Sequence, residues 1–201
     1  MKLTPVSAGN FHCDGGVLLG IIPKVLWSKV YASDENNFTK LALRCLLVET
    51  KNRKILIETG IGDHYPDKHL QNNGVSPVNE LGESLKKAGI SNTSITDVLF
   101  THLHSGQMIP LINTGDKTFA YMSDLIPTAA NSPLLWISAY DLDPVKVMSE
   151  KQNFLEEAAE KDYILFFEHD YYTECATLSK SEKGVVLKEK FALKEISSTF
   201  D

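Results

Sequence analysis

The order of apolar runs in the middle of this 201-residue chain constrains its fold more than any other feature. Two β-rich runs, LALRCLLVET and KNRKILIETG, flank a polar turn at residues 51–53 and predict a hairpin. SPVNELGESLKKAGI has apolar residues at helical spacing and predicts a helix with Ser76 as its cap, Pro77 in its first turn and Gly89 after its end. ITDVLF then predicts another strand. This order favours an α/β or α+β layered fold over an all-β barrel.

The remaining segments continue the alternation. MIPLINTGDKTFAYMSDL predicts a hairpin that turns at residues 113–116, and Asp143 caps a predicted helix that runs to about Lys161. YILFFEHD predicts a buried strand, followed by a last hairpin around residues 183–184. Near the N-terminus, MKLTPVSAG predicts a short strand, and DGGVLLGIIPKVLW, which glycines and a proline interrupt, predicts a strand-turn-strand passage. We find no repeat or linker, so one domain over 1–201 is expected.

Composition narrows the classes of function. The net charge of -6 and the absence of a lysine- or arginine-rich run argue against a nucleic-acid partner. The first residues contain no apolar signal segment, and no apolar run approaches the roughly 20 residues that span a bilayer. Cys13, Cys45 and Cys175 are widely spaced and odd in number, which is typical of reduced thiols rather than a disulfide framework. The sequence therefore predicts a cytoplasmic protein with no membrane partner.

Four side chains that bind metals in other proteins follow predicted strands. His102 and His104 lie two residues apart after VLF, so they project from the same side, while Asp124 follows AYMS and His169 follows FFE. Residues at strand ends of a layered fold gather on one rim, which makes these three imidazoles and one carboxylate a candidate zinc site. Each residue also has a simpler explanation: a surface or core histidine pair, a turn or helix cap for Asp124, and a hydrogen-bonded rim histidine for His169.

Six motifs in order resemble the metallo-β-lactamase family, and its lactonase-like and phosphotriesterase-like hydrolases most of all. They are DGGVLLGIIPKVLWSK, KILIETGIG, VLFTHLH, MSDLIPT, WISAYDLDP and FFEHD, and they span most of the chain. The resemblance implies an α/β (α+β) protein, built as an αβ/βα sandwich with a metal site at the rim between its two sheets. It also implies hydrolysis by a metal-activated water.

The chain departs from the family pattern at its central motif. The family motif HxHxDH is represented here only by His102-Leu103-His104, which Ser105-Gly106 follows, and the later Gly-His motif is absent. We infer an internal deletion with its junction near 104–106, which truncates one half of the sandwich. Glu58 stands where the family usually has an aspartate in a structural role, and its extra methylene need not abolish the hydrogen bonds of that carboxylate.

The resemblance assigns roles to the surviving residues. His102 and His104 resemble ligands of a first metal, Asp124 resembles the carboxylate that bridges two metals, and His169 resembles a ligand of the second. With two ligands lost, we expect one zinc ion and no two-metal site. Asp124 and Tyr140 are the expected catalytic residues, with Tyr140 orienting the substrate or donating to a leaving group; a core residue is its simpler explanation.

Two functions stay open. The first is a metal-dependent hydrolase of a lactone, an ester or a phosphotriester, with turnover impaired by the lost ligands. The second is a non-catalytic remnant of the fold that serves as a binding or assembly module with one ion or none. The expected partner is a small-molecule substrate. The deletion would also expose a sheet edge and apolar surface, which predicts a homo-oligomer.

Overall fold

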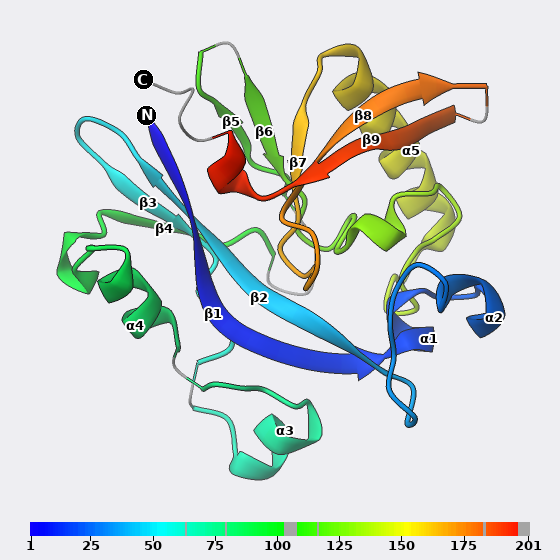
Figure 1. Ribbon diagram of the computed structural model, residues 1–201, viewed down its shortest axis with the longest axis horizontal. Coiled ribbons are helices and arrows are strands. Elements are labelled where there is room, and N and C mark those ends of the chain that lie inside the picture. Colours follow the sequence, from blue (N-terminus) through cyan, green and yellow to red (C-terminus); the bar gives the residue numbers. More distant parts are fainter. Residues whose placement is uncertain (63, 79, 103–107, 116, 183, 197–201) are drawn as a thin grey trace.

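Two β-sheets face each other, and helices cover both outer faces (Figure 1). The computed structural model describes residues 1–62, 64–78, 80–102, 108–115, 117–182 and 184–196. The first sheet has the order β1-β2-β3-β4, and the second has the order β5-β6-β7-β8-β9. The strands are β1 (Lys2–Asp14), β2 (Phe38–Glu49), β3 (Lys54–Ile57), β4 (Asp97–Leu99), β5 (Leu111–Asn113), β6 (Thr118–Tyr121), β7 (Ile164–Phe166), β8 (Cys175–Ser181) and β9 (Gly184–Phe191).

Both sheets are mixed, since β3–β4 and β6–β7 are parallel pairs while the other neighbours are antiparallel. The helices are α1 (Gly15–Leu18), α2 (Lys24–Trp27), α3 (Asp67–Asn72), α4 (Glu80–Lys87) and α5 (Pro144–Glu160), with 3-10 turns η1 (Asn92–Ser94), η2 (Ala129–Asn131) and η3 (Leu193–Glu195). None of the helices within the described ranges is both long and apolar enough to cross a bilayer. The predicted αβ/βα sandwich is confirmed. The deletion junction near 104–106 lies outside the described residues, so the deletion and the single-domain boundary stay predictions.

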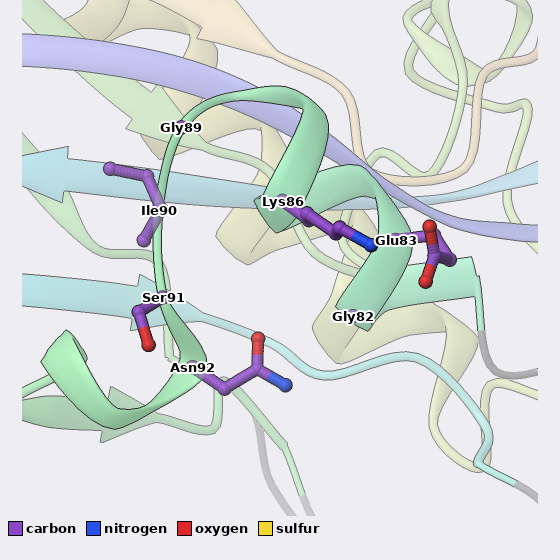
Figure 2. A pocket seen from close by; sticks show the side chains of 7 residues that line it. All are labelled: Gly82, Glu83, Lys86, Gly89, Ile90, Ser91 and Asn92. Atoms are coloured by element: carbon purple, nitrogen blue, oxygen red, sulfur yellow. The ribbon is translucent and has the colours of Figure 1, made fainter.

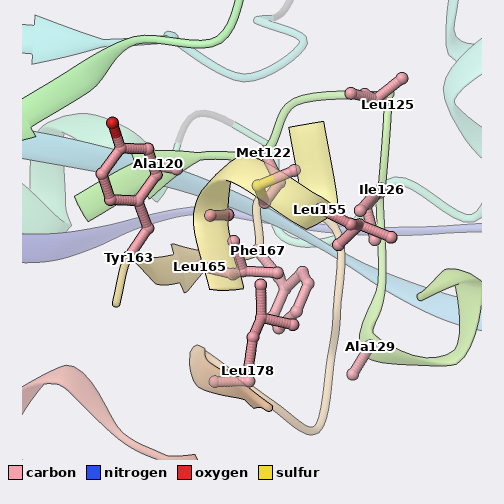
Figure 3. Close-up of a cluster of buried hydrophobic side chains, with 12 residues drawn as sticks. Ala120, Met122, Leu125, Ile126, Ala129, Leu155, Tyr163, Leu165, Phe167 and Leu178 are labelled. Atoms are coloured by element: carbon pink, nitrogen blue, oxygen red, sulfur yellow. The ribbon is translucent and has the colours of Figure 1, made fainter. Parts of the chain in front are cut away.

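Side-chain alternation along the strands builds the core in layers. In β3, Ile57 packs between the sheets, while Leu56 packs in the cluster that also contains Leu85 of α4. On the other side, Leu155 of α5 shares a cluster with Leu165 and Phe167 (Figure 3). Each such side chain contributes about 1.5–3 kcal/mol when it is fully buried. The strand ends are thus fixed by packing on both faces of each sheet.

Several local predictions are confirmed in detail. The N-cap Asp143 accepts a hydrogen bond from the Lys146 backbone N–H at 3.0 Å, Pro144 begins α5, and Lys161 is the C-cap. The hairpins β2–β3, β5–β6 and β8–β9 form at the predicted turns. In each case consecutive residues determine the element: a helix cap and a proline at the start of α5, and a turn sequence in each hairpin.

Two local predictions are wrong. The helix expected from Ser76 begins at Glu80, because Ser76 instead exchanges both backbone hydrogen bonds with Asn10, at 2.9 and 3.0 Å, beside β1. The passage expected as strand-turn-strand contains α1 and α2, and β1 is longer than expected, ending at residue 14. Asp14 caps α1 by accepting from the Gly16 N–H at 2.7 Å.

Candidate metal centre

The candidate centre lies where central strands of both sheets end. Glu58 directly follows β3, His102 follows β4, Asp124 follows β6, and His169 follows β7. Strands β3 and β4 belong to the first sheet, while β6 and β7 belong to the second. Because β3–β4 and β6–β7 are the parallel pairs, the carboxyl ends of each pair point the same way. This topology gathers the four residues at one rim of the sandwich.

Three of the four predicted metal ligands meet at this rim. Asp124 lies between two imidazoles, with its Oδ2 atom 3.3 Å from His102 Nε2 and its Oδ1 atom 3.3 Å from His169 Nε2. Ligands about 2.0–2.1 Å from a tetrahedral zinc ion lie about 3.3–3.4 Å from each other, so each spacing suits an ion between Asp124 and that histidine as well as an ion pair. The two contacts use different oxygens of Asp124. His104 lies outside the described residues. The convergence expected from the sequence is therefore observed for His102, Asp124 and His169, and their ligation stays a prediction.

Hydrogen bonds on the far side of each imidazole orient both histidines toward Asp124. His169 Nδ1 lies 2.9 Å from the Ala42 carbonyl oxygen, which can only accept. His102 Nδ1 lies 2.9 Å from Thr101 Oγ1 and 3.1 Å from Ser123 Oγ, and these two hydroxyls orient its ring. His169 Nδ1 carries the hydrogen of its contact, because a carbonyl oxygen cannot donate. The Nε2 lone pair of His169 remains for an ion or a proton, as in metal sites whose histidines are held by a second hydrogen bond.

Glu58 supports His102 from behind. Its Oε1 atom accepts from the Thr101 backbone N–H at 2.5 Å and from the Thr101 hydroxyl at 2.6 Å. If the extended backbone of β3 continued past Ile57, the Glu58 side chain would point toward α4. The φ of 63° at Glu58 ends the extended backbone, so its side chain does not follow this alternation. Ser123, with φ 46°, joins the same network through its hydroxyl, 2.8 Å from Thr101 Oγ1. The extra methylene of Glu58 thus leaves the carboxylate hydrogen-bonded.

Glu168 is a candidate ligand that sequence reasoning missed. One ligand atom from each of Glu58, His102 and Glu168 lies within 4.8 Å of the other two. The alternation of side chains along β7 could have predicted it. Phe166 packs between the sheets and Phe167 packs under α5, so the next residue, Glu168, is expected between the sheets again.

Comparison with solved structures finds three similar folds. Neither a protein-family model nor a curated protein sequence matches the chain. A probable metal-dependent hydrolase from Staphylococcus aureus superposes with a TM-score of 0.86 at 21% identity, over 95% of this chain and 98% of that one. The dizinc quorum-quenching lactonase AidC gives 0.72 at 15% identity, over 94% and 95% of the two chains. The hydrolase AbOPH in the beta lactamase superfamily gives 0.71 at 13% identity, over 92% of each.

This chain has the metallo-β-lactamase fold. The motif resemblance is thereby confirmed as a likeness of fold.

Charges within this metallo-β-lactamase-fold centre shift two neighbouring groups. Burial raises the pKa of Glu168 to about 7, against the lowering effect of His169 and with the support of Glu58 and Asp124. Burial alone would lower the pKa of His169, but the charge of Glu168 and the contact with Asp124 raise it to about 9. The carboxylates and imidazoles of the centre therefore shift each other's pKa values and titrate as a coupled cluster.

Two further residues near the centre have separable roles. Tyr140 is 43% exposed, so its explanation as a core residue is wrong. Desolvation, and then the charge of Asp124, raise the pKa of its phenol well above the usual value, which keeps the hydroxyl protonated. Asp170 has a structural role, because its carboxylate accepts from the backbone N–H groups of Ala129 at 2.7 Å and of Tyr172 and Thr173 at 2.8 Å.

The pocket of about 610 Å³ beside α4 is unrelated to this centre (Figure 2). Gly82, Lys86 and Asn92 are among the residues that line it. The lining contains none of the candidate ligands and neither predicted catalytic residue. This pocket therefore contributes none of the candidate residues of the centre.

Proposed function

We propose that this chain is a metal-dependent hydrolase that uses an activated water to cleave a lactone, an ester or a phosphotriester. The observation that carries the proposal is the convergence of His102, Asp124 and His169, with both N–O separations at 3.3 Å. Their side chains keep 18%, 25% and 12% of their surface exposed, so water and a small substrate can reach them. The similar structures include a probable metal-dependent hydrolase and a lactonase, which supports the same class of reaction.

We expect one zinc ion at these residues, because imidazole nitrogen and carboxylate oxygen are donors that zinc accepts, and His104 is a further predicted ligand. When bound, zinc supplies a Lewis acid and lowers the pKa of a coordinated water to about 7. In this proposal Asp124, which lies between the two imidazoles, orients the attacking water and accepts its proton at a carboxylate oxygen. The protonated Tyr140 hydroxyl orients the substrate or donates a proton to the leaving oxygen. The Ala42 carbonyl oxygen holds His169 in the required tautomer, and the Thr101 and Ser123 hydroxyls orient His102.

Metal-dependent turnover is the test. The purified chain is assayed for bound metal and for hydrolysis of a γ-lactone, a p-nitrophenyl ester and paraoxon, before and after chelation and after return of zinc. We expect activity to disappear with the metal and to return with zinc. Asp124→Asn should lower kcat at least about 100-fold, since general acid–base groups contribute about 10²–10⁴-fold. Glu174→Gln is the matched control, because Glu174 accepts from the Leu193 N–H and touches none of the ligands.

The outcomes separate the two functions left open by the sequence. Full activity after complete removal of metal would refute the proposal. Bound metal at one ion per chain, with no turnover of any of the three substrates, would favour the binding or assembly module.

Self-association belongs to the same proposal. The short edge strands β4 and β5 carry half-exposed apolar side chains, with Val98 at 48% and Leu111 at 49%. Such edges usually pair or are covered. We expect a homo-oligomer in sedimentation analysis, and a monomer at high concentration would contradict this expectation.

A further inference from the structure

Glu168 is a buried carboxylate with one oxygen that lacks a partner. The residue is 6% exposed, and no hydrogen-bond donor in the described parts of the chain reaches its Oε2 atom. Its Oε1 atom lies 3.8 Å from His169 Nε2, which is close enough for an ion pair but too long for a hydrogen bond. Tyr121 supplies a hydrogen bond to this carboxyl group. Leaving the other buried carboxylate oxygen unpaired is unfavourable, and a proton or a cation satisfies it.

The surroundings of Glu168 are arranged for a cation. One ligand atom each from Glu58, His102 and Glu168 lies within 4.8 Å of the other two. Two other carboxylates, Glu58 and Asp124, act on Glu168 with like charge. Like charges gathered at a buried site repel each other until a cation binds between them.

Glu58 is also fixed in position before any ion binds. Both donors of Thr101, its backbone N–H and its hydroxyl, bind the single atom Glu58 Oε1. The left-handed backbone of Glu58, with φ 63°, is what turns its carboxylate toward this network. A site whose ligands are held by neighbouring hydrogen bonds loses little conformational freedom on binding.

We propose that Glu58, His102 and Glu168 bind one divalent cation. This donor set differs from the one that the motif resemblance implies, since it shares only His102 with it. Two of its three donors are carboxylate oxygens, which suit a harder cation such as Mn²⁺, while the imidazole also accepts zinc. The inference concerns binding alone and does not depend on turnover.

The experiment measures binding of Mn²⁺ to the full chain after removal of metals by a chelator. Electron paramagnetic resonance follows the loss of the free Mn²⁺ signal in the wild type and in the variants Glu168→Gln, Glu58→Gln and Glu174→Gln. We expect one Mn²⁺ per chain in the wild type, and at least tenfold weaker binding in each of the first two variants. Glu174→Gln should bind as the wild type does. Competition with zinc should show that Glu168→Gln weakens Mn²⁺ binding more than zinc binding.

Circular dichroism and the Tm of each apo variant establish that it folds. If Glu168→Gln does not fold, Glu58→Gln decides, because glutamine retains the oxygen that accepts from Thr101. The proposal is overturned if the wild type binds no Mn²⁺, or if the folded variants bind it as tightly as the wild type. Binding that Asp124→Asn abolishes while Glu168→Gln leaves it intact would also overturn it, and would leave the proposed hydrolase standing. A chain that binds Mn²⁺ through Glu168 but hydrolyses nothing would overturn only the proposed function.

Discussion

Replacing Lys151 by methionine should destabilise the protein through three backbone carbonyls. Lys151 lies on α5, its residue exposure is 0%, and its ammonium group donates to the carbonyl oxygens of Asn131, Pro133 at 2.8 Å and Trp136 at 3.1 Å. Three carbonyl oxygens thus surround one nitrogen atom, which has three hydrogens to donate when it is charged and two when it is neutral. These contacts connect α5 to residues 131–136, which precede Tyr140 in the chain.

The expected loss follows from the burial of each acceptor. The Asn131 contact is buried, and leaving a buried acceptor unpaired costs about 1–3 kcal/mol. The Pro133 and Trp136 contacts are part-buried, so each contributes about 0.5–1.5 kcal/mol. Methionine avoids the desolvation of an ammonium group, which offsets part of this sum. We expect a net loss of about 3 kcal/mol, or a Tm lower by about 6–12 °C.

The effect should also depend on pH. Burial lowers the pKa of Lys151 to about 7, against the opposing charge of Asp141. The folded chain then binds fewer protons than the unfolded chain between about pH 7 and the ordinary lysine pKa of 10.5. The free energy of unfolding therefore rises with pH in this window, by up to about 1.4 kcal/mol per unit. Lys151→Met should lack this rise.

Urea denaturation at pH 7 and pH 9 measures both effects. Lys146→Met is the matched control, because Lys146 lies in the first turn of α5 with 68% of its side chain exposed, and its distant ion pair with Glu150 contributes little. The reasoning is refuted if Lys151→Met lies within about 0.5 kcal/mol of the wild type at pH 7, which is the range of neutral surface changes.

Two other substitutions test the centre and the packing of α1. Thr101→Val removes the hydroxyl that donates to Glu58 and contacts His102 Nδ1, while the backbone N–H bond to Glu58 remains. Isothermal titration should give a metal affinity lower by about 10- to 100-fold, as for other groups behind metal ligands. Unchanged affinity would show that this network does not orient His102. Gly15→Ala would place a Cβ atom 2.3 Å from the buried Trp27 ring and should cost about 1–3 kcal/mol in urea denaturation. Gly82→Ala in α4, where the new atom meets Asn92 at 3.5 Å, should instead be neutral or stabilising by up to about 1 kcal/mol.

The sequence was sufficient wherever a structure is encoded in neighbouring residues. The start of α5 at Pro144 follows from its Asp143 cap, and the three hairpins follow from polar turns between apolar runs. It also placed His102, Asp124 and His169 at strand ends, which is why their convergence could be predicted from a layered fold. Such signals act over a few residues, where hydrogen bonding and rotamer preference need no distant partner.

Only the tertiary structure decided which carboxylates lie beside these histidines and at which residue α4 begins. Ser76 does not belong to α4, because its backbone N–H and C=O bind Asn10, which is far away in sequence. Glu58 turns toward His102 because its backbone adopts a left-handed conformation beside Thr101, and Glu168 matters because two sheets close around it. The energy of a buried charge depends on every group that surrounds it, and those groups come from strands that are adjacent only after folding.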